Sequence, residues 1–482
     1  MSEKPLRNAL LTLAGLGVLA LVLYFIDTGD SVKLRQVSAL FAIWAVAAVS
    51  LNLVNGVTGI LSLGHHGFML IGGYITALLI LPDANRQRIA DSGRSRLNDF
   101  TLGLSIENWL DSLGLDALTT PETLWVRFLI ALFIGGLVAA VFGFIVGFPS
   151  LRLRGDYLAI VTFGFGEIIR LLASTDLFAP FTNGALGFTG IPRRIGTSVW
   201  WTFGILAFAT FVMAKLKFSS YGRALQGIRE DEIAAEAMGV NLAYHKVLAF
   251  TLSAFFAGVS GGLYVSWLAS ARLDSFLFFL TFFFLVAISV GGTGSITGVL
   301  FGMALVVFVL QYGDPLEQPY ELTTWALFAG GLLLLAAAAT YLYRASLRLR
   351  PRWNLGIFIL VGLGAAVLLA SLLAPTFGYW EGSFQAFGLR RIALAVLLVV
   401  IMVFRPEGIM GRAEFNWAWL LRERRDEPTD EERAQDAWLS NPELNEDKTA
   451  QLAPAREPKA NLAGADTPTK DITRTDRQKA ED

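Results

Sequence analysis

The chain has 482 residues, of which 54% are hydrophobic and 16% are charged, and its mean hydropathy is +0.54. Soluble domains carry about 25% charged residues, so this composition favours a polytopic membrane protein over a soluble one. The chain has no cysteine and three histidines, which excludes zinc, iron–sulfur and disulfide scaffolds built on cysteine. The net charge of −1 combines a surplus of basic residues over 1–421 with 11 basic and 16 acidic residues over 422–482.

Apolar runs long enough to span a bilayer follow one another from the N-terminus. Long runs lie at 9–26, 36–55, 124–148, 199–216, 246–268, 322–342, 354–374 and 389–404, and shorter or glycine-interrupted runs lie at 59–81, 156–174, 276–290 and 296–312. No small-residue cleavage site follows the first run, so we expect an uncleaved span. The predicted fold is an all-α polytopic membrane protein, a bundle of about 10–12 transmembrane helices in which some helices are short or broken.

The distribution of basic residues predicts the topology. With the N-terminus inside, the basic loops 149–155, 217–245 and 343–353 and the C-terminal tail fall in the cytoplasm, as the positive-inside rule requires. The polar loop 82–123 and the link 312–321 then fall outside. The arginines within 82–123 go against the rule. The acidic tail 412–482 is poor in large apolar residues, and we expect it to be disordered.

Two glycine-rich interruptions mark a candidate transport path. The run 276–290 spans only about 22 Å as a helix, against a core of about 30 Å, and it ends in a cluster of glycines. Gly56–Gly59 and Gly291–Gly294 both read G-x-T-G. An inverted internal repeat and ordinary packing of small residues both explain this pattern. Broken helices at membrane depth line cavities, so we assign to the path Gly59, Ser62, Gly64, His65, Phe68, Glu167, Gly291, Gly292 and Gly294.

Two polar residues of this set have alternative interpretations. Glu167 lies in an apolar run with Arg170 three residues further on. An intramembrane carboxylate is functional by default, whereas a self-satisfied Glu167–Arg170 pair is the structural alternative, and both stay open. For His65, a neutral, hydrogen-bonded packing role is favoured over a contact with substrate.

A charged, helix-forming segment, Ser220–Tyr244, separates two apolar runs. It contains the pattern E-x-A-A-E-x-x-G from Glu232 to Gly239, in which alanines allow close packing against a partner and the glycine ends the helix. The pattern predicts a cytoplasmic docking helix. A solvated loop helix with internal charge pairs is the alternative.

Several stretches together resemble the permease subunit of branched-chain amino-acid ABC importers, the LivM/LivH-type family. They are SLNLVNGVTGILSLGHHGFMLIGGYITALL (50–79), LRLRGDYLAIVTFGFGEIIRLL (151–172), NGALGFTGIP (183–192), GRALQGIREDEIAAEAMGVN (222–241), KVLAFTLSAFFAGVSGGLY (246–264), SVGGTGSITGVLFG (289–302) and FRPEGIMG (404–411). These stretches run in the family's order through most of 36–312 and return at 389–411. The outer loop 82–123, a pair of spans within 313–388 and the tail depart from the family's usual pattern.

The resemblance implies that residues 219–244 form a coupling segment with a cytoplasmic coupling helix. The residues assigned to this role are Arg223, Arg229, Glu230, Asp231, Glu232, Ala235, Glu236 and Gly239. The resemblance also implies three kinds of partner: cytoplasmic ABC ATPase subunits, a second related permease subunit, and a periplasmic or extracellular solute-binding protein. The expected organisation is an N-terminal span and link (1–35), a permease core (36–312), an inserted pair of spans (313–388), a last span (389–411) and the tail (412–482).

The predicted function is therefore import of branched-chain or related apolar amino acids across a bacterial inner membrane, with both termini cytoplasmic. No G-x-x-x-x-G-K-[ST] phosphate loop occurs, so a separate subunit must hydrolyse ATP. We expect no cofactor, metal or nucleic acid, and no enzymatic activity. A urea or short-amide importer and an ion-coupled secondary carrier remain the alternatives; the latter gives the segment Ser220–Tyr244 no role.

Overall fold

The computed structural model describes residues 3–91, 123–150, 156–193 and 196–312, with short further pieces at 320–321, 383–384 and between 392 and 414. These residues belong to one compact unit, 1–415. The predicted spans at 322–342 and 354–374, most of the outer loop 82–123 and the tail beyond 415 lie outside the described residues.

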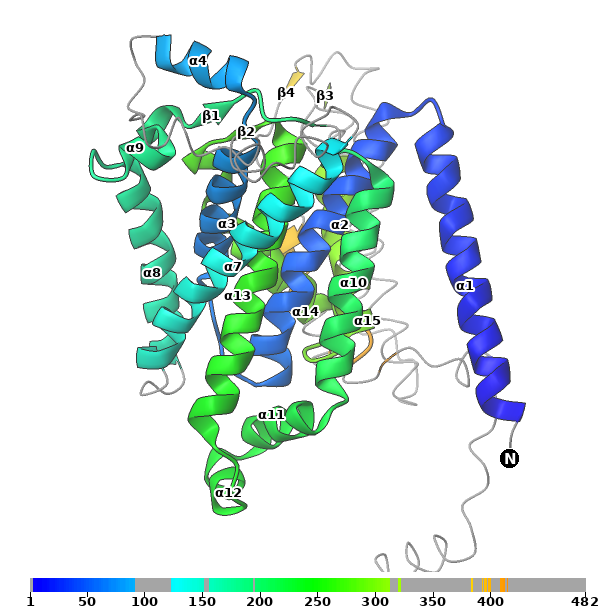
Figure 1. The fold of residues 1–482 in the computed structure, drawn as a ribbon. Coiled ribbons are helices and arrows are strands. Elements are labelled where there is room, and N and C mark those ends of the chain that lie inside the picture. The colour runs from blue at the N-terminus through cyan, green and yellow to red at the C-terminus, as the bar shows by residue number, and fades with distance from the viewer. Residues whose placement is uncertain are drawn as a thin grey trace, which may run out of the picture. The chain divides into compact units, whose positions relative to one another are not determined.

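The described part is a bundle of helices that run back and forth along one axis (Figure 1). The long helices are α1 (Glu3–Thr28), α2 (Val32–Asn52), α3 (His65–Ile80), α7 (Leu124–Ser150), α8 (Asp156–Ser174), α10 (Val199–Lys217), α13 (Leu242–Leu268), α14 (Phe279–Gly291) and α15 (Ile296–Tyr312). Six helices of the described part are long and apolar enough to cross a membrane, or seven if the bent pair His65–Ile80 and Asp83–Asp91 is one span. The predicted all-α polytopic class is confirmed.

Short elements cap the two ends of the bundle (Figure 1). At one end lie α4 (Asp83–Asp91), α9 (Ala179–Thr182) and the antiparallel pair β1 (Phe188–Thr189) and β2 (Ser270–Ala271). A 3₁₀ turn, Leu273–Phe276, leads from β2 into α14, and a second one, Gly184–Leu186, precedes β1. A further antiparallel pair joins β3 (Tyr320–Glu321) to β4 (Ser383–Phe384). At the opposite end lie α11 (Ser220–Glu230) and α12 (Glu232–Ala237), together with the N-terminal end of α1.

Helix α2 forms the centre of the bundle. Almost every residue from Ala39 to Asn52 is buried, which is the pattern of a helix that is apolar on all sides and enclosed by other helices. Helix α13 packs closely on α3, because the backbones of Gly72 and Gly258 touch and leave no room for a Cβ atom. In lipid, where apolar surface alone does not hold helices together, such small residues allow the close backbone approach that does.

Two interruptions break the helical pattern at the end of the bundle that carries α11. The first break comprises a π-helical turn, Leu53–Val57, and an extended segment that reaches α3 at His65. The second break, residues 292–295, joins α14 to α15 in a helical hairpin. Helix α14 itself is short, with 13 residues, as the sequence predicts. Together with the 3₁₀ turn before it, it forms the 19-residue stretch Leu273–Gly291, which is one of the six candidate spans.

Candidate functional site

The coupling segment folds into two short helices joined by a sharp corner at Asp231. The backbone N–H of Asp231 closes α11 on the carbonyl of Gly227, and its carboxylate accepts hydrogen bonds from the N–H groups of Ile233 (2.8 Å) and Ala234 (3.1 Å) at the start of α12. Asp231 is thus both the end of one helix and the N-cap of the next. Gly239 follows α12 with a φ of +84°, the left-handed conformation that glycine adopts at helix ends.

The residues assigned to coupling do not all face outward. Arg223, Glu230, Asp231, Glu236 and Gly239 are exposed, Arg229 and Glu232 are half-buried, and Ala235 is buried. Glu232 forms an ion pair with Lys246 on α13, with 2.5 Å between Nζ and Oε1. This pair and the buried Ala235 hold α12 against the bundle.

Two apolar residues of the coupling segment, Ile233 and Met238, are highly exposed. Ile233 is 73% exposed and Met238 is 85% exposed. Both belong to α12 or its C-terminal turn, at the tip of the end that carries α11 (Figure 1). Both apolar side chains are therefore accessible to a partner at this end of the bundle. Neither was predicted as a site residue, although both lie within the pattern E-x-A-A-E-x-x-G.

Arg229 extends from α11 into the bundle instead of outward. Its guanidinium donates a hydrogen bond to the backbone carbonyl of Gly56 in the first break. It also lies 3.5 Å from the backbone carbonyl and from the hydroxyl of Thr293 in the second break. Arg229, which the sequence predicted to contact an ATPase, therefore contacts both helix breaks instead.

The two G-x-T-G motifs lie against each other. The buried side chain of Asn52, the last residue of α2, accepts a hydrogen bond from the N–H of Gly294 (2.9 Å) and donates one to the carbonyl of Ser295 (3.3 Å). The backbone of Gly56 packs directly on Gly294. Gly294 has a φ of +94°, which a residue with a Cβ atom rarely adopts. The motifs noted in the sequence thus form one junction.

The second break also receives the segment that follows the last predicted span. The N–H groups of Ile409 and Met410 donate to the carbonyls of Val290 (2.8 Å) and Gly291 (3.0 Å), which close the C-terminal end of α14. Gly292, with a φ of +121°, packs against the backbone of Gly411. Residues 408–411, the described part of the FRPEGIMG stretch, are therefore bound to the second break.

Glu414 fixes that segment to the start of α15. Its carboxylate accepts hydrogen bonds from the N–H groups of Ile296 (2.8 Å) and Thr297 (3.0 Å) and from the Thr297 hydroxyl (2.8 Å). It also pairs with Lys217 at the end of α10, at 2.5 Å. Burial raises the pKa of this carboxyl, but the hydrogen bonds from Lys217 and from the helix N-terminus outweigh burial and bring the pKa below its usual value. Sequence reasoning missed Glu414 and Asn52.

Of the remaining path residues around the first break, Gly59 is exposed, whereas Ser62, Gly64 and Phe68 are packed into the bundle. The N–H of Ser62 donates to the side chain of Asn55 (3.0 Å), and the backbone of Gly64 lies against Thr162 of α8. Phe68 is buried, and its ring packs on those of neighbouring aromatic residues.

His65 lies fully inside, between α2, α3 and α13. Its Nε2 atom is 3.3 Å from the hydroxyl of Ser50 and 3.1 Å from that of Ser253. This hydrogen-bonded environment is the one expected for a packing histidine.

Glu167 takes part in a small polar cluster at the middle of α8. Its carboxylate accepts a hydrogen bond from Arg170 at 2.8 Å, which is the pair considered in the sequence analysis. Its other oxygen lies 3.6 Å from Nε2 of the buried His66 on α3. The cluster joins α3 to α8, and the backbones of Gly67 and Gly166 touch beside it.

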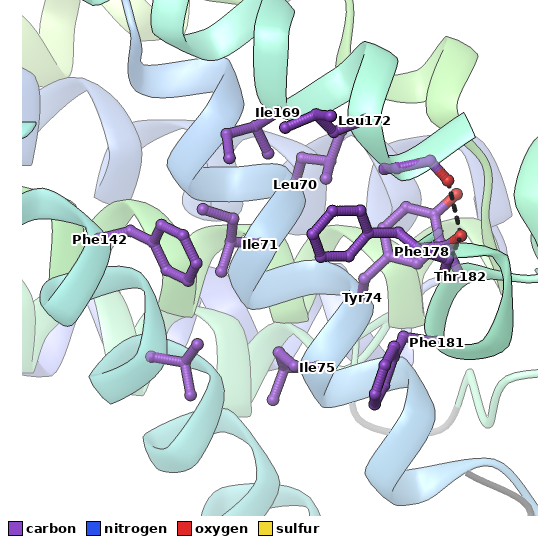
Figure 2. Close-up of a pocket in the computed structure, with 12 residues that line it drawn as sticks. Leu70, Ile71, Tyr74, Ile75, Phe142, Ile169, Leu172, Phe178, Phe181 and Thr182 are labelled. Carbon is purple, nitrogen blue, oxygen red and sulfur yellow. Dashed lines mark hydrogen bonds between the residues drawn. The ribbon is translucent and has the colours of Figure 1, made fainter. Parts of the chain in front are cut away.

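An apolar cavity of about 280 Å³ lies elsewhere, between α3, α7, α8 and α9 (Figure 2). None of the predicted path residues lines it; the labelled lining residues are Leu70, Ile71, Tyr74, Ile75, Phe142, Ile169, Leu172, Phe178, Phe181 and Thr182. The Thr182 hydroxyl is already bonded to the carbonyl of Ala173 (2.6 Å). The cavity accommodates an aliphatic group but offers no charged partner to an ammonium or a carboxylate. Within the described residues, no cluster of three or more His, Asp or Glu side chains is placed to hold a metal ion.

Comparison with known proteins agrees with this architecture. The profile of the family described as branched-chain amino acid transport system / permease component matches residues 34–338. The chain is 32% identical over 357 residues to the high-affinity branched-chain amino acid transport system permease protein LivM of Escherichia coli (strain K12), an alignment that covers 67% of this chain and 72% of that protein.

More distant relatives match shorter stretches. A probable LivM of Methanocaldococcus jannaschii is 24% identical over 290 residues, 56% of this chain and 78% of that protein. The fructose import permease protein FrcC of Rhizobium meliloti is 30% identical over 224 residues, 42% of this chain and 59% of that protein. No solved structure matches the chain significantly. The family match and the LivM similarity each span most of the chain, and the chain therefore belongs to the family of permease components of branched-chain amino acid transport systems, as a membrane transport subunit and not an enzyme.

Proposed function

We propose that this permease subunit imports branched-chain amino acids in a complex with ATP-hydrolysing subunits, a second related permease and a solute-binding protein. The family match over residues 34–338 is the observation that carries the proposal. The names of the LivM relatives support the substrate class. Comparison with FrcC shows that permeases of related sequence serve other substrates, so substrate identity needs its own test.

The coupling segment is the surface we assign to the ATP-hydrolysing subunit. Helix α12 projects from one end of the bundle and presents the exposed Ile233 and Met238 together with the exposed Glu236, and α11 adds the exposed charge of Arg223. Apolar anchors inside a charged rim are the usual composition of a protein–protein contact. The pair Glu232–Lys246 braces α12 on α13, so a push on this surface is passed to a membrane-spanning helix.

The same assignment orients the chain in a bacterial inner membrane. The ATP-hydrolysing partner is cytoplasmic, so the end with α11 and α12 faces the cytoplasm. The N-terminal end of α1 lies at that end too (Figure 1). The opposite end, with α4, α9 and β1, then faces the solute-binding protein.

Reconstitution tests the proposal. The complete complex is placed in liposomes with ATP inside and the binding protein outside, and uptake of labelled leucine, urea and fructose is compared. We expect leucine uptake that depends on ATP and on every component. Uptake by this chain alone, driven by an ion gradient and indifferent to ATP, would support a secondary carrier instead. Preferential uptake of urea or fructose by the complex would overturn the substrate assignment and leave the permease role intact.

A further inference from the structure

We propose that Arg229 is the positioning residue through which movement of the coupling segment reaches both helix breaks at once. This inference rests on the proposed function and adds a specific route for the coupling. Arg229 belongs to α11, yet its guanidinium bonds the carbonyl of Gly56 and lies beside the carbonyl and hydroxyl of Thr293. One cytoplasmic side chain therefore contacts two segments that are more than 230 residues apart in the sequence.

The chemistry of the breaks explains why an arginine suits this position. A carbonyl at a helix break has lost its intrahelical partner and needs a donor from elsewhere, above all where water is scarce. Guanidinium carries five N–H donors in a fixed planar arrangement and stays charged, so it serves two carbonyls in different directions. Withdrawing it would leave both carbonyls short of a donor, and the breaks are therefore expected to follow the arginine when it moves.

Glycines of the two motifs lie so close to the Arg229 side chain that a Cβ atom would collide with it. A Cβ atom on Gly59 would lie 2.7 Å from Cγ of Arg229, and one on Gly294 would lie 2.9 Å from its Nη1 atom. Both glycines also have positive φ, +76° and +94°. The last glycine of each G-x-T-G motif thus borders Arg229, one along the aliphatic stem and the other at the guanidinium.

Neighbouring contacts tie the two breaks together, so a movement of α11 would displace both of them. Leu225 and Ile228 bury the inner face of α11 in the bundle, so Arg229 moves with its helix. The side chain of Asn52 bonds the backbone of the second break directly to the end of α2, which couples one break to the other. A polar cavity of about 80 Å³ borders Arg229 and gives its guanidinium room to shift.

The test compares Arg229→Gln and Arg229→Lys with the matched control Lys215→Gln in the complete reconstituted complex. Lys215 is an exposed cation on α10 that contacts the Phe211 ring and neither break. We expect Arg229→Gln to assemble and hydrolyse ATP but to transport at least tenfold fewer molecules per ATP. Lysine, with a charge but no planar fork, should give an intermediate ratio. Lys215→Gln should keep the wild-type ratio.

A labelling measurement separates transmission from a merely structural role. The chain has no cysteine, so Leu61→Cys introduces a single thiol into the exposed part of the first break. ATP should change the rate at which a maleimide reacts with this thiol in the wild-type background and leave that rate unchanged with Arg229→Gln.

Two outcomes would count against different statements. Wild-type transport per ATP in both Arg229 variants, with an unchanged labelling response, would overturn the role of Arg229 alone. Failure of the wild-type complex to transport with ATP would overturn the proposed function first.

Discussion

Replacing Glu414 with glutamine tests whether the segment after the last span is held by charge. The carboxylate receives Lys217 and the first two N–H groups of α15, and only 20% of its side chain is exposed. Glutamine keeps the shape and one acceptor oxygen, but it removes the negative charge and turns an NH₂ group toward donors. Lys217, with 10% of its side chain exposed, loses its counter-charge.

The expected loss follows from these contacts. Breaking a buried ion pair by removing one partner costs roughly 3–5 kcal/mol. A negative charge at a helix N-terminus adds about 0.3–1 kcal/mol. The partial exposure of the carboxylate and the remaining amide oxygen reduce the loss, so we expect about 3 kcal/mol of stability to disappear in Glu414→Gln.

Unfolding of the purified chain in mixed micelles, titrated with sodium dodecyl sulfate and followed by tryptophan fluorescence, measures this loss. Asp274→Asn is the matched control, because Asp274 pairs with Arg272 at 3.7 Å with most of both side chains exposed. That exposed pair should contribute less than about 1 kcal/mol. A double-mutant cycle with Lys217→Met isolates the pair itself. If Glu414→Gln unfolds at the wild-type midpoint, or the cycle shows no coupling, the charge of Glu414 does not hold its segment to Lys217 and α15.

Three further predictions concern single sites. The pKa of Glu414 in the folded chain lies below its ordinary value of 4.5, so its contribution is complete above about pH 4.5 and is lost as the pH falls through the lower folded pKa. The stability difference between wild type and Glu414→Gln should therefore be constant from pH 5.5 to 8 and shrink in acid; a difference that grows in acid would contradict this. Gly294→Ala should lose about 1–3 kcal/mol in the same unfolding assay because of its φ of +94° and the proximity of Arg229, whereas Gly227→Ala, with open space around it on α11, should lose nothing. Equal midpoints for these two alanine variants would refute the crowding at the junction. The hydroxyl of Tyr74 is buried without a hydrogen-bond partner among the described residues, so Tyr74→Phe should leave stability unchanged or raise it by up to about 1 kcal/mol. A loss larger than 1 kcal/mol would reveal a partner.

The helices and breaks were predictable because lipid imposes a strong constraint on sequence. Apolar length predicts α7, α10 and α13, and the short run before Gly291 predicts a short helix that ends at a break. The G-x-T-G motif occurs at both breaks, and the sequence left open whether it marks an internal repeat or ordinary packing of small residues. What it did not indicate is that they touch, since contact between residues this far apart depends on how α2 and the α14–α15 hairpin pack.

The composition of the sequence predicted where the candidate site lies, but it did not predict which way the side chains of that site point. A charged helical segment between spans indicates a docking surface, but the pattern does not show which charges face the partner. Arg229 and Glu232 both proved to contact the bundle, while Ile233 and Met238 are exposed. Glu414 was not separable from the acidic tail by sequence, because only its contact with the start of α15 distinguishes it from the glutamates that follow.

The central claim is that the surface around Met238 is where an ATP-hydrolysing subunit binds. A photoreactive amino acid placed at Met238 in cells tests it most directly, with the same substitution at the exposed Phe208 of α10 as the control. We predict that the Met238 position captures an ATP-hydrolysing protein encoded with the transport system and that the Phe208 position does not. Crosslinking at Met238 only to lipid, or to no nucleotide-hydrolysing protein, would contradict the account.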